Sequence, residues 1–224
     1  MKNENTYNLI LLSFFAAITV LMAFTPLGFI PLVIINATIV HIPVILGSLF
    51  LGPKRGAFLG FIFGLTSFIN NTFRAATASA FVFSPVIAYS TFGLPGVFKS
   101  LYICFVPRIL VGIVPYFVYV GILKLMKDKK KTASYVGFVF AGLTGAFTNT
   151  LFVMSGIYFL YKDAYAVATN HAADELLSVI MGIVTFNGVI EAIVAAVIVV
   201  GVGTALTAIK PVYYVRKQAV EVPA

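Results

Sequence analysis

The sequence predicts an all-α membrane protein in which six transmembrane helices form one bundle. Of its 224 residues, 61% are hydrophobic and only 10% are charged, and the mean hydropathy is +1.05. Soluble domains average about 45–50% apolar and about 25% charged residues. Because a membrane-spanning helix takes about 20 residues, we expect residues 1–224 to form a single integral membrane domain with five to seven spans.

Six stretches with few charges are expected to form the helices. The first ends near Pro26, because the Pro- and Gly-rich run that follows cannot continue a helix. A tight corner at Gly52 and Pro53 joins the second and third into a hairpin. The fourth either is kinked at Pro107 or takes Pro107 as its first helical residue. The last is longer than the hydrocarbon core requires, so it must tilt or protrude. The approximate helices are 7–26, 36–51, 56–73, 98–126, 133–161 and 176–209.

A seventh apolar stretch, 75–97, is interpreted as an outer loop between the third and fourth helices. It contains several Ser and Thr residues, has Pro85 in its middle and includes the Gly-Leu-Pro-Gly run at 93–96. These residues favour turns and interrupt helices. Its apolar part, Phe81 to Pro85 with Phe83 and Ser84, is interpreted as a lid over a ligand or, alternatively, as packing on the top of the bundle.

The positions of the basic residues favour six helices with both termini in the cytoplasm. In that topology eleven of the 15 Lys and Arg residues lie on the cytoplasmic side, as the positive-inside rule requires. If 75–97 spanned the membrane, the basic run 124–131 would lie outside. The net charge of +8 is therefore explained by topology, and no nucleic-acid partner is predicted. The eleven are Lys2, Lys54, Arg55, Lys124, Lys127, Lys129, Lys130, Lys131, Lys210, Arg216 and Lys217.

Two charged residues, Arg108 and Glu191, are expected at membrane depth. Ionisable groups are costly there, so each is a candidate functional residue. Asn187 lies four residues before Glu191 and would project from the same helix face. Two interpretations remain open: Arg108 and Glu191 neutralise each other across the bundle, or one or both line a ligand cavity.

Other polar residues are expected near the outer ends of the helices. Asn70 and Asn71 end the third helix, and Arg74 follows one turn later. Amides beside a guanidinium suit an uncharged amide or hydroxyl ligand that also carries a carboxylate; alternatively, the asparagines cap the helix. Asn149 in the fifth helix either bonds a neighbouring helix or contacts a ligand. His41 is expected to be hydrogen-bonded within the bundle or, alternatively, to contact a ligand.

Small residues form stripes on two of the predicted helices. Ser13 and Ala17 are four residues apart on the first helix, and Gly56, Gly60 and Gly64 repeat at the same spacing on the third. Such stripes allow helices to approach closely. We interpret the glycines as internal packing, and we interpret Ser13 and Ala17 as a docking surface for a partner membrane protein.

Motifs typical of several enzyme classes are missing from the sequence. It has no G-x-x-x-x-G-K-[ST] for nucleotide phosphates, no G-x-S-x-G and no H-E-x-x-H. No catalytic residue, metal site or cofactor is therefore predicted in this chain. An intramembrane enzyme would need a catalytic constellation at bilayer depth, and a stand-alone transporter is often built from inverted repeats, none of which we find.

The sequence resembles the substrate-binding S components of energy-coupling factor (ECF) vitamin transporters. The resemblance rests on six short-looped helices and on the run from Leu51 to Ala57, Leu-Gly-Pro-Lys-Arg-Gly-Ala, followed by Gly60 and Gly64. The segments 36–43, 81–85 and 105–110 look most like the pantothenate-specific members. On the first helix, Ser13-x3-Ala17 departs from the family's Ala-x3-Ala pattern.

The resemblance implies vitamin uptake across a cell membrane, which we expect to be a prokaryotic plasma membrane. An S component of this family binds its vitamin from outside and releases it inside after tipping against a transmembrane coupling protein, which two ATPase subunits drive. ATP and Mg²⁺ would then be bound by those partners. Pantothenate is the expected vitamin, and riboflavin, folate, cobalamin or a pyrimidine precursor are the alternatives. The residues expected to bind it are Asn70, Asn71, Arg74, Phe83, Ser84, Arg108, Asn149, Asn187 and Glu191.

Overall fold

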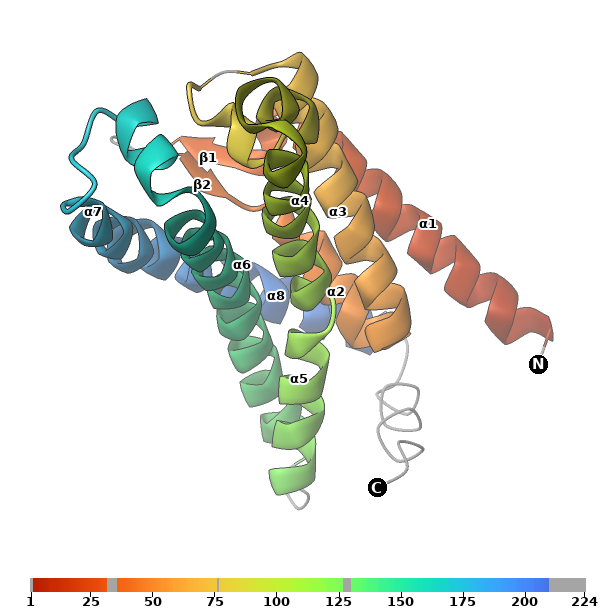
Figure 1. Cartoon of the computed structure of the whole chain (residues 1–224). Helices are drawn as coiled ribbons and strands as arrows, with labels where there is room; N and C mark the ends of the chain where they lie inside the picture. Colours follow the sequence, from red (N-terminus) through yellow and green to blue (C-terminus); the bar gives the residue numbers. More distant parts are fainter. Residues whose placement is uncertain (1, 32–35, 76, 127–129, 210–224) are drawn as a thin grey trace.

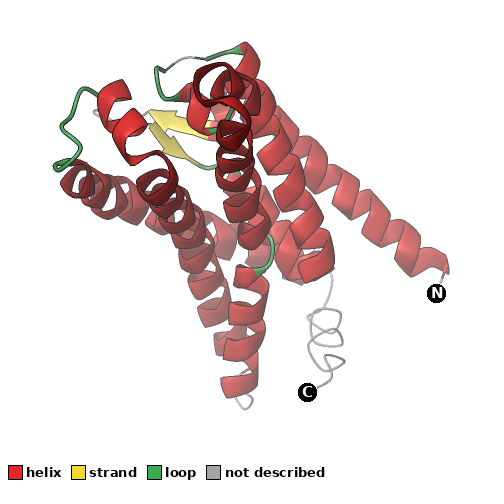
Figure 2. Ribbon diagram, in the orientation of Figure 1, coloured by secondary structure: helices red, strands yellow, loops and turns green. Residues whose placement is uncertain are grey.

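The computed structural model describes residues 2–31, 36–75, 77–126 and 130–209. It consists almost entirely of helices that run between two ends of an elongated bundle (Figures 1 and 2). The helices are α1 (Lys2–Phe24), α2 (His41–Leu51), α3 (Pro53–Phe73), α4 (Pro85–Val111), α5 (Val114–Leu125), α6 (Lys130–Ala168), α7 (Leu176–Ile183) and α8 (Val189–Ile209).

Two short strands and three short turns complete the structure. Strand β1 (Phe29–Pro31) pairs antiparallel with β2 (Asn36–Thr38). The 3₁₀ turns are η1 (Pro26–Gly28) and η2 (Ala80–Val82), and a π-helical turn, η3 (Val184–Gly188), joins α7 to α8. We call the end of the bundle that carries the strands and η2 the strand end, and the end that carries the α2–α3 turn the corner end (Figure 1).

Five helical runs among the described residues are long and apolar enough to cross a membrane. They are 5–24, 53–73, 85–125, 131–168 and 176–208. The expected helix over 36–51 is shorter than predicted, because residues 36–38 pair as a strand and α2 has only 11 residues. An 11-residue helix is about 17 Å long, roughly half of the hydrocarbon core. The predicted cytoplasmic C-terminal tail, 210–224, lies outside the described residues.

The expectation that 75–97 is a loop throughout is wrong for its second half. Residues 85–97 belong to α4. The hydroxyl of Ser84 accepts a hydrogen bond from the backbone N–H of Ile87 at 3.3 Å and so caps the helix, and Pro85 occupies the first turn, where its missing N–H costs nothing. The Gly-Leu-Pro-Gly run at 93–96 kinks α4 but does not end it. The kink lies at Gly93, which adopts a φ of 66°.

The fourth predicted helix, 98–126, is interrupted where α4 ends and α5 begins. The chain leaves the helix at Gly112 and Ile113, which frees the Gly112 carbonyl for the buried Ser48 hydroxyl on α2, at 2.6 Å. Pro107 lies inside α4 rather than at its start. The fifth predicted helix continues beyond 161 to Ala168 after a kink at Tyr161.

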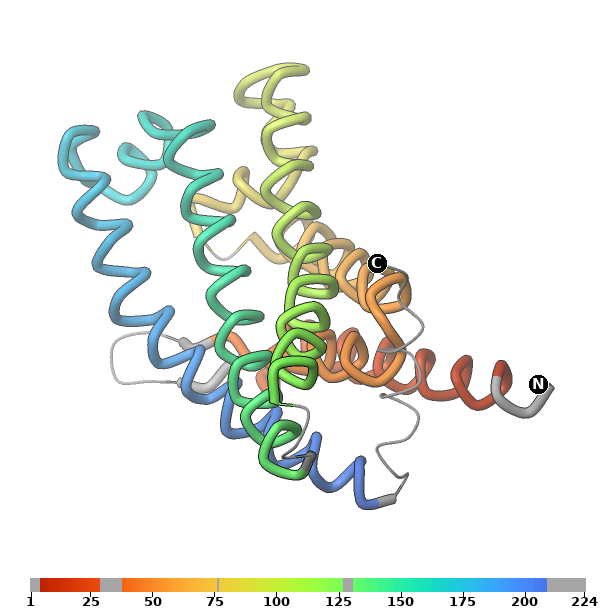
Figure 3. The backbone as a smooth tube through the Cα atoms, turned by 90° about the horizontal axis from the view of Figure 1, so that it is seen from below, coloured from red at the N-terminus to blue at the C-terminus, as the bar shows by residue number. Residues whose placement is uncertain are grey.

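Helix α2 is the centre of the hydrophobic core. Ten of its eleven residues are buried, and its side chains join those of α1, α3, α6 and α8 in the main apolar cluster. His41, at its first position, is fully buried, and neither ring nitrogen has a hydrogen-bond partner among the described residues. The expected internal hydrogen bond of His41 is therefore wrong. Helix α1 lies at the edge of the bundle, where it packs on α2 and α3 (Figure 3).

The glycine stripe on α3 packs internally, as expected. A methyl group on Gly60 would meet the backbone carbonyl of Arg108 and would lie 2.8 Å from the Cα of Ile109. One turn earlier, Gly56 lies against Gly112, and one turn later Gly64 faces Phe105. The backbones of α3 and α4 thus touch along three turns, which fixes the position of Arg108 relative to α3.

Candidate functional site

A cavity of about 380 Å³ lies in the strand half of the bundle. This volume falls within the usual range of small-molecule pockets, about 300–1,000 Å³. Its lining residues come from α1, α3, α4, α6, α7, η3 and α8 and from the segments before α2 and α4. Eight of the nine residues expected to bind the ligand line it: Asn70, Asn71, Arg74, Phe83, Arg108, Asn149, Asn187 and Glu191.

Arg108 is held between two aromatic rings in the wall of this cavity. Its guanidinium carbon lies 4.8 Å from the ring centre of Phe83 and 5.4 Å from that of Phe63. One terminal nitrogen donates to the backbone carbonyl of Ile103 at 2.8 Å, and the other approaches the hydroxyl of Ser67 at 3.4 Å. These two rings and the bond to Ile103 restrict the position of the guanidinium.

The Nε edge of the guanidinium is left unpaired within the described part of the chain. Arg108 is only 6% exposed, and its Nε has no hydrogen-bond partner among the described residues. Within that part of the chain no ion pair joins Arg108 to Glu191 or to any other carboxylate, so the first of our two interpretations of this pair is not supported. A guanidinium edge that presents Nε and a terminal nitrogen matches the two oxygens of a carboxylate.

Glu191 and two amides form a second polar group in the cavity wall. A Glu191 carboxylate oxygen accepts a hydrogen bond from the backbone N–H of Thr38 at 2.8 Å, and the other oxygen is 3.4 Å from the Thr150 hydroxyl. The Oδ1 atoms of Asn149 and Asn187 are buried and have no partner among the described residues. These oxygens are acceptors, so this group suits hydroxyl or amide donors and disfavours an anion.

The π-helical turn η3 leads directly into Glu191. It runs from Val184 to Gly188 and contains Asn187. π turns are rare and occur frequently at functional sites. Gly188 follows Asn187 and faces Thr150 of α6, with a hypothetical methyl carbon 3.3 Å from the Thr150 side chain. The small residue lets this turn approach α6 and brings Asn187 and Glu191 to the same cavity wall as Asn149.

The last turns of α3 supply the mouth of the cavity. The Asn71 amide nitrogen donates to the backbone carbonyl of Ser67 at 2.8 Å, which leaves the Asn71 carbonyl oxygen for other donors. Arg74, the C-cap residue of α3, is exposed and approaches the backbone carbonyl of Phe24 at 3.5 Å. It lies at the rim, where a second cation adds attraction for an approaching anion.

Three of the residues selected from the sequence lie outside this cavity. Ser84 is fully buried, is 2.7 Å from the Thr72 hydroxyl and caps α4; it supports the segment that carries Phe83 instead of facing the cavity. Ser13 and Ala17 are exposed on α1, which agrees with their assignment to a surface separate from the ligand.

Several cavity residues were missed by sequence reasoning. Thr66 and Ser67 lie four residues before Asn70 and Asn71, so one polar face of α3 could have been recognised from its helical spacing. Phe63 extends the same face. Thr38 carries no such signal, because its role depends on the backbone N–H that it presents to Glu191.

Comparison with known proteins assigns the chain to a family. A profile of the family described as "ECF transporter, substrate-specific component" matches residues 7–203. The pantothenic acid transporter PanT of Lactococcus lactis subsp. cremoris is 35% identical over 176 residues, which cover 77% of this chain and 79% of that protein. The pantothenate transporter PanT of Leuconostoc mesenteroides is 32% identical over 219 residues, 93% of this chain and 96% of that protein. The chain therefore belongs to the family of substrate-specific components of ECF transporters.

Proposed function

We propose that this chain binds pantothenate in the cavity around Arg108 and carries it across a membrane as the S component of an ATP-driven importer. The observation that carries the proposal is the guanidinium of Arg108, which lies in the cavity wall beside two aromatic rings and has an unpaired Nε among the described residues, while hydrogen-bond acceptors lie elsewhere in the same wall. Two relatives that bear the name of pantothenate transporters support the choice of vitamin.

The chemistry of pantothenate matches both polar groups of the cavity. Its carboxylate would pair with the Nε edge of Arg108, with Asn70 and Asn71 nearby on α3. Its amide and its two hydroxyls would donate to the oxygens of Asn149, Asn187 and Glu191. The Glu191 carboxylate repels an anion, so it favours the orientation in which the vitamin's carboxylate lies at Arg108.

Calorimetry on the purified chain tests this proposal. Pantothenate should bind, and its alcohol analogue, in which a CH₂OH group replaces the carboxylate, should bind at least about tenfold more weakly because the charge-assisted pair with Arg108 is lost. Equal affinities would refute the carboxylate's role at Arg108. Binding of riboflavin or folate in place of pantothenate would refute the proposed vitamin. Cobalamin is several times larger than pantothenate and does not suit a cavity of about 380 Å³.

Translocation requires partners that supply energy. The chain has no G-x-x-x-x-G-K-[ST] motif, so we propose that ATP and Mg²⁺ are bound by two separate ATPase subunits and that a transmembrane coupling protein links them to this chain. The five span-length helices among its described residues indicate a multi-pass membrane protein, and we propose the bacterial plasma membrane as its location.

The small-residue stripe on α1 is the proposed docking surface for the coupling protein. Ser13→Leu or Ala17→Leu adds bulk where close helix approach is expected. We expect vitamin binding in detergent to persist, because neither residue lines the cavity, and we expect transport and copurification of the coupling protein to fail. Gly121→Leu on α5 is the matched control, since no atom lies within 4 Å of a methyl group built there. Loss of vitamin binding, or retained transport, would argue against docking through this stripe.

The proposed topology places the strand end outside the cell and both termini inside. A membrane-impermeant maleimide added to intact cells should label Ser90→Cys, which is exposed near the strand end, and should leave Thr132→Cys, exposed at the start of α6, unlabelled until the cells are opened. The native Cys104 gives little background because it is fully buried. The opposite labelling pattern would reverse the topology.

A further inference from the structure

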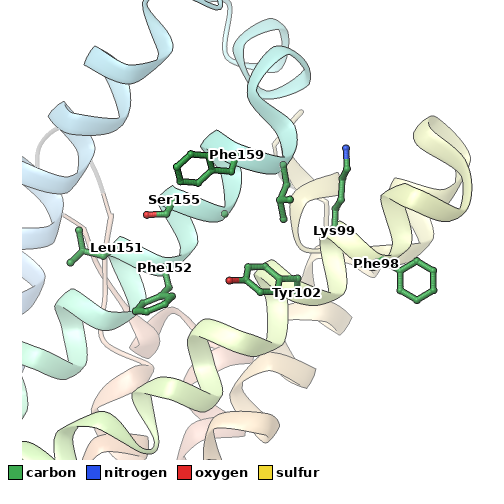
Figure 4. A pocket seen from close by; sticks show the side chains of 9 residues that line it. Phe98, Lys99, Tyr102, Leu151, Phe152, Ser155 and Phe159 are labelled. Atoms are coloured by element: carbon green, nitrogen blue, oxygen red, sulfur yellow. The ribbon is translucent and has the colours of Figure 1, made fainter.

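A second, larger cavity opens on the outside of the bundle between α4 and α6. It has a volume of about 540 Å³ and is walled mainly by apolar side chains (Figure 4). Residues of α4 form one wall and residues of α6 the other. We call it the α4–α6 groove, and its lining residues are Phe98, Lys99, Tyr102, Leu151, Phe152, Ser155, Gly156, Phe159 and Leu160.

The groove and the candidate site use different faces of α6. Asn149, Thr150, Val153 and Met154 line the candidate site, whereas the residues between and after them line the groove. This alternation follows from the 3.6-residue helical repeat. No residue lines both cavities, so the groove is not an extension of the vitamin site.

The groove faces the bilayer. Both of its helices belong to runs that are long and apolar enough to span a membrane, and large side chains on its rims are open, with Phe159 79% and Phe98 65% exposed. The groove is narrow at Gly156, because a methyl carbon built there would lie 2.9 Å from the Ile103 side chain. From Leu151 to Leu160 the groove follows α6 for about 14 Å. An apolar channel of this length within the hydrocarbon layer suits an acyl chain.

One end of the groove carries a positive charge. Lys99 is the only charged residue that lines it, and its ammonium lies 5.5 Å from the ring centre of Tyr161. Lys99 forms no ion pair within the described part of the chain. It lies about two and a half helical turns closer to the strand end than Arg108, near the kinks at Gly93 and Tyr161. This position corresponds to the level at which phospholipid headgroups meet the ends of long spanning helices.

We propose that the α4–α6 groove binds one phospholipid with an anionic headgroup. The acyl chain lies along Phe152, Ser155 and Phe159, and the phosphate lies beside Lys99 (Figure 4). The apolar walls match an acyl chain, and the single cation at the headgroup end attracts an anionic headgroup. The groove should therefore bind anionic phospholipids more tightly than zwitterionic ones.

The absence of tryptophan from the chain permits a direct test. Phe152→Trp places a single fluorophore in the groove, and Phe14→Trp places one on an exposed position of α1 as the control. Each variant is reconstituted in vesicles that contain phosphatidylglycerol or phosphatidylcholine with brominated acyl chains at equal mole fraction. Brominated phosphatidylglycerol should quench the groove reporter with about fivefold apparent enrichment over phosphatidylcholine, and the control should show no preference.

Variants of Lys99 identify the source of the preference. In the Phe152→Trp background, Lys99→Gln should abolish the preference, and Lys99→Arg should keep it because the charge is retained. The melting temperature establishes that each variant is folded, so the test does not depend on the proposed vitamin. If both lipids quench both reporters equally, the groove contacts only the lipid that surrounds any membrane protein. If neither lipid quenches the groove reporter, no lipid enters the groove. Either result overturns the proposal.

Discussion

Arg108→Ala should reduce the affinity for pantothenate by about 30- to 700-fold, the equivalent of about 2–4 kcal/mol. The carboxylate would enter a desolvated cavity in which Arg108 is the only buried cation among the lining residues that the structure describes. Arg108→Lys should recover little of the loss, because an ammonium cannot present two parallel donors and does not stack between Phe63 and Phe83 as a planar group does. Calorimetry on purified variants measures the change.

A comparison with the alcohol analogue separates binding from folding. The wild-type chain should prefer pantothenate over the alcohol, and Arg108→Ala should remove that preference, even if the variant also loses stability. Arg55→Ala is the matched control, because Arg55 lies at the corner end and bonds only to the Leu51 carbonyl, at 3.5 Å. If Arg108→Ala still distinguishes the two ligands as the wild type does, Arg108 has a structural role and does not bind the carboxylate.

Gly60→Ala should destabilise the protein by about 1–3 kcal/mol, although alanine is the better helix former. The added methyl group would overlap the carbonyl of Arg108 and approach the Cα of Ile109 to 2.8 Å. Backbone atoms cannot rotate away, so α3 and α4 must separate. Since the displaced segment carries Arg108, pantothenate affinity should fall as well. Thermal unfolding in detergent and calorimetry measure the two effects.

The control variant for Gly60→Ala should change the stability in the opposite direction. Gly121→Ala on α5 meets no atom within 4 Å, and alanine in an unobstructed helix is favoured by about 0.5–1 kcal/mol over glycine. Its melting temperature should be unchanged or slightly raised. A Gly60→Ala protein as stable as Gly121→Ala would show that α3 and α4 are not in backbone contact.

Much of the candidate site could be predicted from the sequence, because polar residues are conspicuous in an apolar chain. Arg108, Asn149, Asn187 and Glu191 were selected for the free-energy cost of placing them at membrane depth, and all four line the cavity. Asn70 and Asn71 were recognised by their position at the end of a helix. Composition does not show which hydrogen-bond partner each polar group has. The unpaired Nε of Arg108 and the bond between Thr38 and Glu191 are therefore seen only in the folded structure.

The helix boundaries were less predictable, for two physical reasons. Pro and Gly favour turns, but Gly93 bends α4 without ending it, and Pro85 starts a helix that Ser84 caps. Hydropathy also does not distinguish an apolar strand or a short buried helix from a span. This is why 36–51 was read as one helix, although residues 36–38 pair as β2. The π turn at 184–188 leaves no mark in the residue pattern.

The shortness and complete burial of α2 constrain how the protein enters the membrane. A helix of 11 residues cannot cross the hydrocarbon layer on its own, and the unpaired backbone groups of its flanks would be costly in lipid. Besides α1 and α3, it packs against α5, α6 and α8, which are synthesised later. We infer that α2 enters the membrane together with α3 as a hairpin, and that it is fully enclosed only when α6 and α8 arrive. Biogenesis of this bundle therefore finishes only with its last helix.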